Sequence, residues 1–290
     1  MSRAPLLPPA FAAGNVAVVT GAASGMGLAA ALHFAKLGLK VALGDLEGPA
    51  LSAAAAQVVQ AAGGAQNVLA VATDVSRAAD LAALRDATFE RLGPVSVLMN
   101  NAGVGNNPGL PWENVSAWQT LVDVNLWGVI HGVAAFVPAL LAASAPAVVI
   151  NTGSKQGITS PPGNSAYNMS KAALRNYTES LAHALRAAAP GRISAHLLIP
   201  GFTYTGMTGA PEKPAGAWTA AQVVDFMLES VARGDFYVLC PDHAVDRKTD
   251  ELRMQWSIDD IIQNRPALSR WHPDFEGQFA AYMAAAKAAP

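Results

Sequence analysis

Short runs of β-branched and apolar residues alternate with longer helix-forming stretches through the first two-thirds of the chain, and this alternation most restricts its fold. Helical spacing or Ala-rich composition marks the stretches at 49–62, 78–92, 115–143 and 166–188. Strands joined through such helices form right-handed crossovers, and hence a parallel sheet covered on both faces. The sequence predicts one doubly wound α/β domain. Its strands are expected at 16–20, 41–45, 68–73, 95–100, 147–152, 193–199 and 236–240.

Three regions depart from this alternation. Residues 1–14 are a Pro-containing arm, and 203–222 is rich in Gly, Pro and Thr, which is typical of a loop or lid. The last 50 residues change character, with helices expected near 246–264 and 273–288. We therefore expect an N-terminal arm (1–14), a main domain (15–240) and a helical C-terminal extension (241–290).

Composition excludes several classes of protein. Hydrophobic residues make up 52% of the chain and charged residues 14%, which is too apolar for a disordered chain. The net charge of −2 provides no basic surface for nucleic acid or an anionic membrane. A single cysteine, Cys240, excludes an internal disulfide, and six histidines without helical pairing argue against a metal site.

Two segments of the sequence indicate where in the cell the protein is expected. The N-terminal stretch has one arginine and an apolar run broken by prolines, which makes a poor secretion signal, so we expect a reducing, cytoplasmic setting. Val129–Ile150 is apolar enough for a membrane span, but Pro138 and Pro146 interrupt it. A helix followed by a buried strand explains this segment better, and no membrane partner is expected.

A glycine-rich turn follows the first predicted strand. Gly21, Gly25 and Gly27 let the backbone turn tightly and approach a pyrophosphate at the start of the next helix. Asp45 ends the second strand, where a carboxylate accepts both ribose hydroxyls of an adenosine and repels a 2′-phosphate. Leu46 follows it, and Ser24 stands where a basic residue would meet a phosphate, so NAD is preferred over NADP. The alternatives are a plain tight turn and a solvated strand end.

Ser154, Tyr167 and Lys171 form a third group. Tyr167 and Lys171 are four positions apart and share one face of a helix. An adjacent ammonium favours the phenolate, so Tyr167 is expected to exchange a proton with a substrate hydroxyl or carbonyl. Ser154 closes another strand, where its hydroxyl is expected to bind the same oxygen.

Together these motifs resemble those of the short-chain dehydrogenases/reductases over about residues 15–208. Order and spacing both fit, including the 13 positions between Ser154 and Tyr167. The resemblance implies a Rossmann-like single domain with a seven-stranded parallel sheet and a nicotinamide cofactor. The matching residues are Thr20-Gly21-x-x-x-Gly25-x-Gly27, Asp74-Val75, Asn100-Asn101-Ala102-Gly103, Asn125, Ser154, Tyr167-x-x-x-Lys171 and Pro200-Gly201.

The resemblance also implies a role for each matching residue. Tyr167 is the general acid/base, Lys171 lowers its pKa and binds the nicotinamide ribose, and Ser154 orients the substrate oxygen. Asn125 holds a water that links Lys171 to a proton relay, although alone it fits a polar residue in a helix interface equally well. The cofactor-binding set is Gly21, Ser24, Gly25, Met26, Gly27, Asp45, Leu46, Asp74, Val75, Asn101, Ala102, Gly103, Tyr167, Lys171, Pro200, Gly201, Thr203 and Thr205.

The substrate end is apolar and aromatic, which favours a hydrophobic secondary alcohol or ketone. Many family members end soon after the seventh strand, so the extension puts the usual tetramer interface in doubt. It is expected to cover the active site, swap onto a neighbour or form another contact in a homodimer or tetramer. His243 beside Asp242 is interpreted as a solvated turn. The residues expected around the substrate are Val104, Gln156, Ile158, Tyr204, Met207 and Trp218.

Two other functions remain open on this scaffold. One is a non-redox enzyme, such as a dehydratase or epimerase. The other is a dinucleotide sensor without catalytic activity. A sensor has no need to keep Ser154, Tyr167, Lys171 and Asn125 together, so the leading hypothesis is hydride transfer between NAD(H) and a small-molecule alcohol or ketone.

Overall fold

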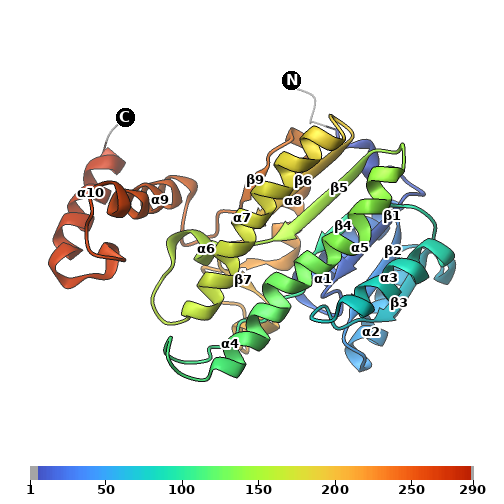
Figure 1. Cartoon of the computed structure of the whole chain (residues 1–290), viewed down its shortest axis with the longest axis horizontal. Helices are drawn as coiled ribbons and strands as arrows, with labels where there is room; N and C mark the ends of the chain where they lie inside the picture. The colour runs from blue at the N-terminus through green and yellow to red at the C-terminus, as the bar shows by residue number, and fades with distance from the viewer. Residues whose placement is uncertain (1–5, 289–290) are drawn as a thin grey trace.

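Seven parallel strands form one sheet, in the order β3-β2-β1-β4-β5-β6-β9 (Figure 1). The computed structural model describes residues 6–288, so residues 1–5 of the predicted arm and 289–290 of the extension lie outside the described residues. All seven predicted runs form strands. The central strands consist mainly of apolar residues because they are buried on both faces of the sheet. Their bounds are β1 Val16–Thr20, β2 Lys40–Asp45, β3 Val68–Ala72, β4 Val95–Asn100, β5 Ala147–Thr152, β6 Ile193–Ile199 and β9 Tyr237–Leu239.

Helices cover both faces of the sheet and enclose two apolar cores. The first core lies between the sheet and α1 (Gly25–Lys36), α2 (Pro49–Ala61) and α8 (Ala220–Arg233). The second lies under α3 (Ala78–Arg91), α5 (Gly128–Ala142) and α7 (Ser165–Ala188). This arrangement confirms the predicted doubly wound fold. It brings the carboxyl ends of β1 and β4, where the strand order reverses, to one edge of the sheet.

The predicted helix at 115–143 contains a π-helical turn. α4 (Val115–Val122) leads into the turn Asp123–Trp127, which continues as α5. In the described part of the chain, the whole segment Val115–Ala142 is long and apolar enough to cross a membrane, yet half of its most apolar window is buried. It packs against the sheet, α3 and α7 and is a core helix of this fold.

The predicted loop at 203–222 is a short ribbon followed by a helix. β7 (Thr203–Tyr204) pairs with β8 (Trp218–Thr219), a 3-10 turn lies at Gly206–Thr208, and α8 already begins at Ala220. A local contact explains why α8 begins inside the predicted loop. The Thr219 hydroxyl accepts from the Gln222 amide at 3.2 Å and the Gln222 side chain accepts from the Thr219 amide at 2.8 Å, a reciprocal cap.

The C-terminal extension projects away from the sheet, beyond the short helix α6 (Gln156–Thr159) (Figure 1). It contains α9 (Arg247–Ile262) and α10 (Glu276–Ala288), joined through 3-10 turns at Ser269–Trp271 and Pro273–Phe275. Trp256 is 4% exposed, and the rings of Phe279 and Tyr282 lie 5.2 Å from its own. The extension therefore has a small aromatic core of its own, as expected for packing tryptophans.

Candidate active site

A cleft of about 900 Å³ lies at the carboxyl ends of β1, β2 and β4. It brings together most of the residues predicted to bind the cofactor, from five separate segments of the chain. Gly27, Tyr167, Lys171, Pro200, Gly201 and Thr203 do not line it. The predicted residues that do are Gly21, Ser24, Gly25, Met26, Asp45, Leu46, Asp74, Val75, Asn101, Ala102, Gly103 and Thr205.

The glycine turn forms the floor of this cleft at the start of α1. Gly21 has φ of +65°, and a Cβ there would lie 2.7 Å from the Cα of Ala102. A Cβ at Gly27 would collide with the carbonyl oxygen of Gly21, so only glycine fits this position of the turn although it does not line the cleft. Ser24 makes no side-chain cap, so the first N–H groups of α1 remain available to an anion. This cradle fits a dinucleotide pyrophosphate.

Asp45 stands at the rim of the same cleft. Its Oδ2 accepts a 2.7 Å hydrogen bond from the Ala23 amide, and its Oδ1 accepts one of 2.8 Å from Leu46. The carboxylate is thereby fixed at the end of β2, against the glycine turn. A ribose that enters the cleft would meet an anion with a defined position.

Thr20 joins the ends of β1 and β4. Its hydroxyl accepts from the amides of Asn101 and Ala102 at 3.0 and 3.2 Å. The Asn101 side chain donates back to the Thr20 carbonyl at 3.1 Å. These bonds keep the two strand ends at a constant separation, which sets the width of the cleft.

Tyr167 and Lys171 lie on α7, facing the end of β5. Lys171 is 4% exposed, its Nζ donates to the Thr152 carbonyl at 2.8 Å, and it lies 5.8 Å from the centre of the Tyr167 ring. Burial lowers the pKa of Lys171 to about 8. Ser154 follows β5, and its hydroxyl accepts from the Gln156 amide at 3.1 Å. The predicted triad is thus assembled in space.

The pKa of Tyr167 differs from the expectation. Burial raises it, and the side-chain hydrogen bond with Ser154 lowers it by less. The lowering expected from Lys171 is not found, because desolvation disfavours the phenolate more than the nearby groups favour it. Tyr167 therefore holds its proton at neutral pH.

Asn125 lies in the π-helical turn and is fully buried. Its Oδ1 accepts from the Val104 amide at 2.8 Å, and its Nδ2 donates to the Val104 carbonyl at 2.9 Å and to the Ser170 hydroxyl at 3.2 Å. A Cβ at Gly103 would lie 3.3 Å from Asn125 Oδ1 and 3.6 Å from Lys171 Nζ. Asn125 therefore holds the wall of the cleft close to Lys171. Turns of this kind are frequent at functional sites.

Sequence reasoning missed Asn164. Its Oδ1 accepts from the Tyr167 amide at 3.2 Å, which caps α7, and its Nδ2 donates to the Gly105 carbonyl at 3.2 Å. Asn164 thus ties the start of the Tyr167 helix to the cleft wall. An asparagine three residues before a helical tyrosine is a recognisable cap, so this signal was present in the sequence.

The residues predicted around the substrate separate into two groups. Val104 and Met207 line the cleft, and Met207 is 55% exposed. Gln156 is exposed, and the Tyr204 hydroxyl donates to the Pro211 carbonyl at 3.2 Å. The structure does not bring Gln156, Ile158, Tyr204 or Trp218 into the lining of the cleft. Ile158 packs on the Leu197, Ile199 and Leu239 cluster, and the Trp218 ring packs against Phe226 and His243.

Cys240 is buried directly after β9, and burial raises its pKa to about 12. Across residues 6–288, no group of three His, Cys, Asp or Glu side chains is placed to hold a metal ion. The absence of a catalytic metal remains a prediction.

Comparison with known proteins supplies a further finding. A family model described as short chain dehydrogenase matches residues 15–215. The 1-deoxy-11-beta-hydroxypentalenate dehydrogenase of Streptomyces arenae is 35% identical over 264 residues, covering 87% of this chain and 89% of that protein. The 2-(R)-hydroxypropyl-CoM dehydrogenase of Xanthobacter autotrophicus is 35% identical over 242 residues, covering 77% and 94%.

A solved structure is also similar over most of the chain. It is a short chain dehydrogenase/reductase from Burkholderia phymatum in complex with NAD. Its TM-score is 0.79 at 34% identity, and the match covers 88% of this chain and 96% of that one. The family model and the similar solved structure thus both describe a short chain dehydrogenase.

Proposed function

The chain belongs to the short-chain dehydrogenase/reductase family, and from that premise we propose that it transfers a hydride between NAD(H) and a hydrophobic secondary alcohol or ketone. The family uses a nicotinamide dinucleotide, and members similar to this chain are dehydrogenases. The observation that carries the proposal is the position of Lys171, which is buried beside Tyr167 and whose Nζ lies 3.6 Å from the Cβ position of Gly103 in the cleft wall.

Each residue of the triad has a physical task in this proposal. When bound, the nicotinamide supplies the hydride acceptor or donor. Tyr167 gives a proton to the ketone oxygen during reduction and removes it from the alcohol during oxidation. Ser154 binds the same oxygen and orients it, and Lys171 places a positive charge behind the phenol. Asn125 holds the Val104 wall, through which a water is proposed to link Lys171 to solvent.

Asp45 supports the preference for NAD over NADP. Its carboxylate is fixed at the cleft rim by two backbone amides, and Leu46 and Ser24 beside it carry no positive charge. A 2′-phosphate at this position would meet a like charge without compensation. The neighbouring Burkholderia phymatum structure is a complex with NAD, which agrees with this preference.

Hydrophobic side chains favour an apolar substrate. Val104 and Met207 lie at the open end of the cleft, and Leu110, Trp112 and Phe202 are exposed on nearby loops. A pocket of this kind favours bulky cyclic or aromatic ketones over charged or polyhydroxylated compounds. The Streptomyces arenae relative is named for a hydroxylated carboxylate, so its name supports the hydroxyl group of the proposed substrate but not the absence of charge.

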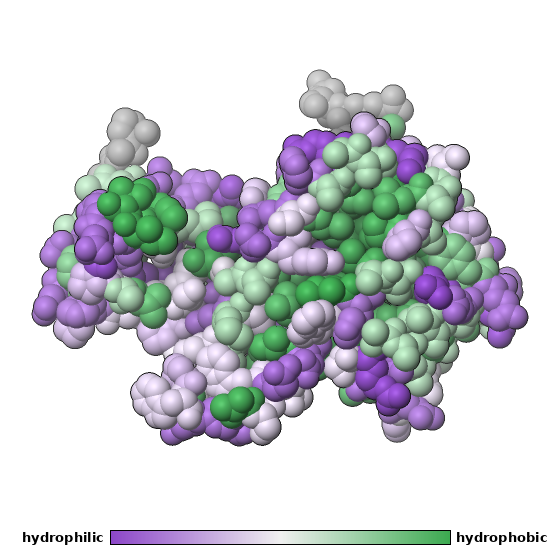
Figure 2. All heavy atoms as spheres, in the orientation of Figure 1, coloured by the Kyte–Doolittle hydropathy of each residue, from purple (hydrophilic) through white to green (hydrophobic). Residues whose placement is uncertain are grey.

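We also propose a cytoplasmic homo-oligomer. On the face shown in Figure 2, a hydrophobic band crosses the main body over α5 and α7. Trp127, directly before α5, and Met169, in α7, are 47% and 46% exposed. A contiguous apolar surface of this kind is typical of a subunit interface. Analytical ultracentrifugation of the purified chain distinguishes a dimer or tetramer from a monomer.

The decisive experiment follows absorbance at 340 nm with NAD or NADP and a panel of secondary alcohols, and in reverse with ketones and reduced cofactor. Turnover with NAD and a preference for bulky apolar ketones supports the proposal. Preference for charged or polyhydroxylated substrates contradicts the substrate class. NAD binding by calorimetry without turnover across the panel would instead favour the sensor hypothesis, and release of water or inversion without net redox would favour the dehydratase or epimerase hypothesis.

A further inference from the structure

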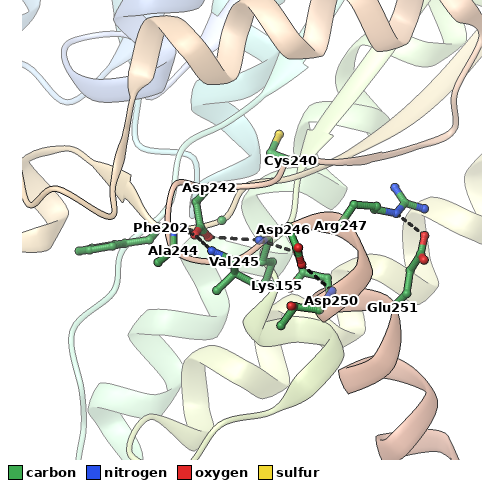
Figure 3. A network of polar contacts seen from close by, with 12 residues as sticks. Lys155, Phe202, Cys240, Asp242, Ala244, Val245, Asp246, Arg247, Asp250 and Glu251 are labelled. Atoms are coloured by element: carbon green, nitrogen blue, oxygen red, sulfur yellow. Dashed lines mark hydrogen bonds and ion pairs between the residues drawn. The ribbon is translucent and has the colours of Figure 1, made fainter. Parts of the chain in front are cut away.

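A buried ion-pair cluster connects the residue next to Ser154 with the C-terminal extension (Figure 3). Lys155 Nζ lies 3.2 Å from Asp242 Oδ2 and 2.6 Å from Asp250 Oδ2. The three side chains, which we call the Lys155 cluster, are 16%, 4% and 6% exposed. Lys155 directly follows Ser154, Asp242 lies just after β9, and Asp250 belongs to α9.

The interpretation of His243 beside Asp242 as a solvated turn holds for His243, which is exposed, but not for Asp242, whose side chain is 4% exposed. Its Oδ1 accepts from the amides of Ala244 and Val245 at 3.0 and 2.7 Å, so the turn closes around the carboxylate. Its Oδ2 accepts from the Phe202 amide at 3.1 Å in addition to the Lys155 ammonium. Burial acts to raise the pKa of Asp242, but the Phe202 hydrogen bond and the Lys155 charge lower it overall. Asp242 is therefore a buried anion with a full set of donors.

The cluster also touches the segment predicted to meet the nicotinamide. The Lys155 amide donates to the Pro200 carbonyl at 3.3 Å. A Cβ at Gly201 would lie 2.5 Å from Asp242 Oδ2 and 2.9 Å from Lys155 Nζ, so the charged groups pack directly on this backbone. The Phe202 amide completes the contact. The Lys155 amide and the side chains of Lys155 and Asp242 thus hold the residue next to Ser154 against the Pro200–Phe202 segment, and Asp250 joins this arrangement through Lys155.

Asp250 brings the extension into this arrangement. Besides the ion pair of Asp250 with Lys155, α9 contacts the body where Met254 and Ile158 pack on the apolar cluster of Leu197, Ile199 and Leu239. Figure 1 shows α10 well away from the sheet. Burial raises the pKa of Asp250, and Lys155 and Arg253 lower it by less. The ion pair is therefore the main polar connection between α9 and the reacting end of the site.

We propose that Lys155 is a positioning residue through which the C-terminal extension sets the geometry of Ser154 and the Pro200–Phe202 segment. The inference rests on the proposed function, because Ser154 is taken to orient the substrate oxygen. Reaction rates depend steeply on such alignment, whereas cofactor affinity depends mainly on the glycine turn and Asp45, which do not contact the Lys155 cluster in any bond described above. The cluster should therefore affect kcat more than NAD binding.

Four variants test this inference. Lys155→Met removes the ammonium, Asp250→Asn removes the charge of the extension with little change of shape, and Lys155→Arg keeps a cation that reaches both carboxylates. Glu251→Gln is the matched control, since it breaks the exposed Arg247–Glu251 pair on the same helix, whose atoms lie 2.7 Å apart (Figure 3). We expect kcat to fall about tenfold or more in Lys155→Met, to fall less in Asp250→Asn, and to recover in Lys155→Arg, with the NAD dissociation constant within about twofold throughout.

Hydrogen exchange of the 200–205 segment provides a readout that needs no turnover. The Phe202 amide should exchange faster in Lys155→Met and in Asp250→Asn, and at the wild-type rate in Glu251→Gln. Unchanged exchange in the first two variants overturns the inference, as does an equal loss of kcat and NAD affinity. If Lys155→Met fails to fold, the same measurements on Asp250→Asn test the inference. If the wild-type chain shows no turnover, the proposed function fails, and exchange alone still decides whether the extension is coupled to this segment.

Discussion

The Nζ atom of Lys171 donates a 2.8 Å hydrogen bond to the carbonyl oxygen of Thr152, the last residue of β5. This bond ties the middle of the sheet to α7 and fixes the ammonium on the inner side of Tyr167. The lysine is almost completely buried, and burial alone accounts for its lowered pKa. Two predictions follow from this position, one for stability and one for activity.

The stability of the chain should rise with pH in the alkaline range because of Lys171. Its pKa is about 8 in the folded chain and 10.5 ordinarily, so below pH 8 both states hold the proton and the burial penalty is fully present. Between these values the folded state has lost the proton and the unfolded state has not, so the free energy of unfolding rises, by up to about 3 kcal/mol. Urea denaturation of Lys171→Met should lack this rise, and the exposed control Lys36→Met should keep it. An identical slope in Lys171→Met would refute the assignment.

The two directions of the reaction should depend on pH in opposite ways. Burial raises the pKa of Tyr167, so the phenol is protonated at neutral pH and ready to donate during reduction. Oxidation needs the deprotonated form, and its kcat/KM should rise as the pH increases above neutrality. Initial rates in both directions from about pH 6 to 10 measure this. Faster oxidation at acid pH would contradict the role of Tyr167.

Replacing Tyr167 by Phe should remove the proton transfer and leave the cleft intact. We expect kcat to fall at least about a hundredfold, with the NAD dissociation constant unchanged. The control is Tyr177→Phe, which makes the same change on the same helix and should keep nearly full activity. Substantial turnover in Tyr167→Phe would exclude it as the acid/base.

Cofactor preference should respond to Asp45 and Leu46. The double variant Asp45→Ser, Leu46→Arg removes the anion and adds a cation at the cleft rim, so the NAD to NADP ratio of kcat/KM should fall at least about tenfold. The control Glu47→Arg adds the same charge one residue further along and leaves Asp45 in place. A ratio that stays the same in the double variant would mean that Asp45 does not face the ribose.

The glycine turn should not tolerate a methyl group at Gly27. The added Cβ in Gly27→Ala would collide with the Gly21 carbonyl and displace the turn, so NAD affinity should fall at least about tenfold in calorimetry. Gly277→Ala is the control, because nothing lies within 4 Å of its Cβ position. Wild-type affinity in Gly27→Ala would show that the turn does not contact the cofactor.

The sheet was predictable because burial on both faces selects continuous apolar runs such as 147–152 and 193–199. The cleft followed from glycines at one strand end. These are local patterns, in which the residue type and its neighbours in sequence carry the information. The position of Asp45 at the rim is of the same kind, since a carboxylate at a strand end can be recognised without the rest of the fold.

Other features depend on contacts between distant segments. Nothing near Asp242 in the sequence indicates that Lys155, 87 positions earlier, compensates its charge. The pKa of Tyr167 depends on the protein packed around it, which spacing to Lys171 does not reveal. The position of Trp218 depends on the pairing of β7 with β8. These strands have two residues each, too few for a periodic pattern that the sequence could reveal. The π-helical turn at Asn125 could not be predicted either, because it lies within a continuous apolar helical stretch.

The burial of Cys240 makes the chain suitable for labelling at a single introduced cysteine. It is the sole cysteine of the chain, and burial keeps it in the thiol form at neutral pH. Thiol-specific reagents will therefore find the native chain inert, and a cysteine introduced on the exposed side of α9 by Glu251→Cys would be labelled alone. A fluorophore or spin label placed there would report changes in the mobility and surroundings of α9 during turnover, in a chain that needs no background mutations.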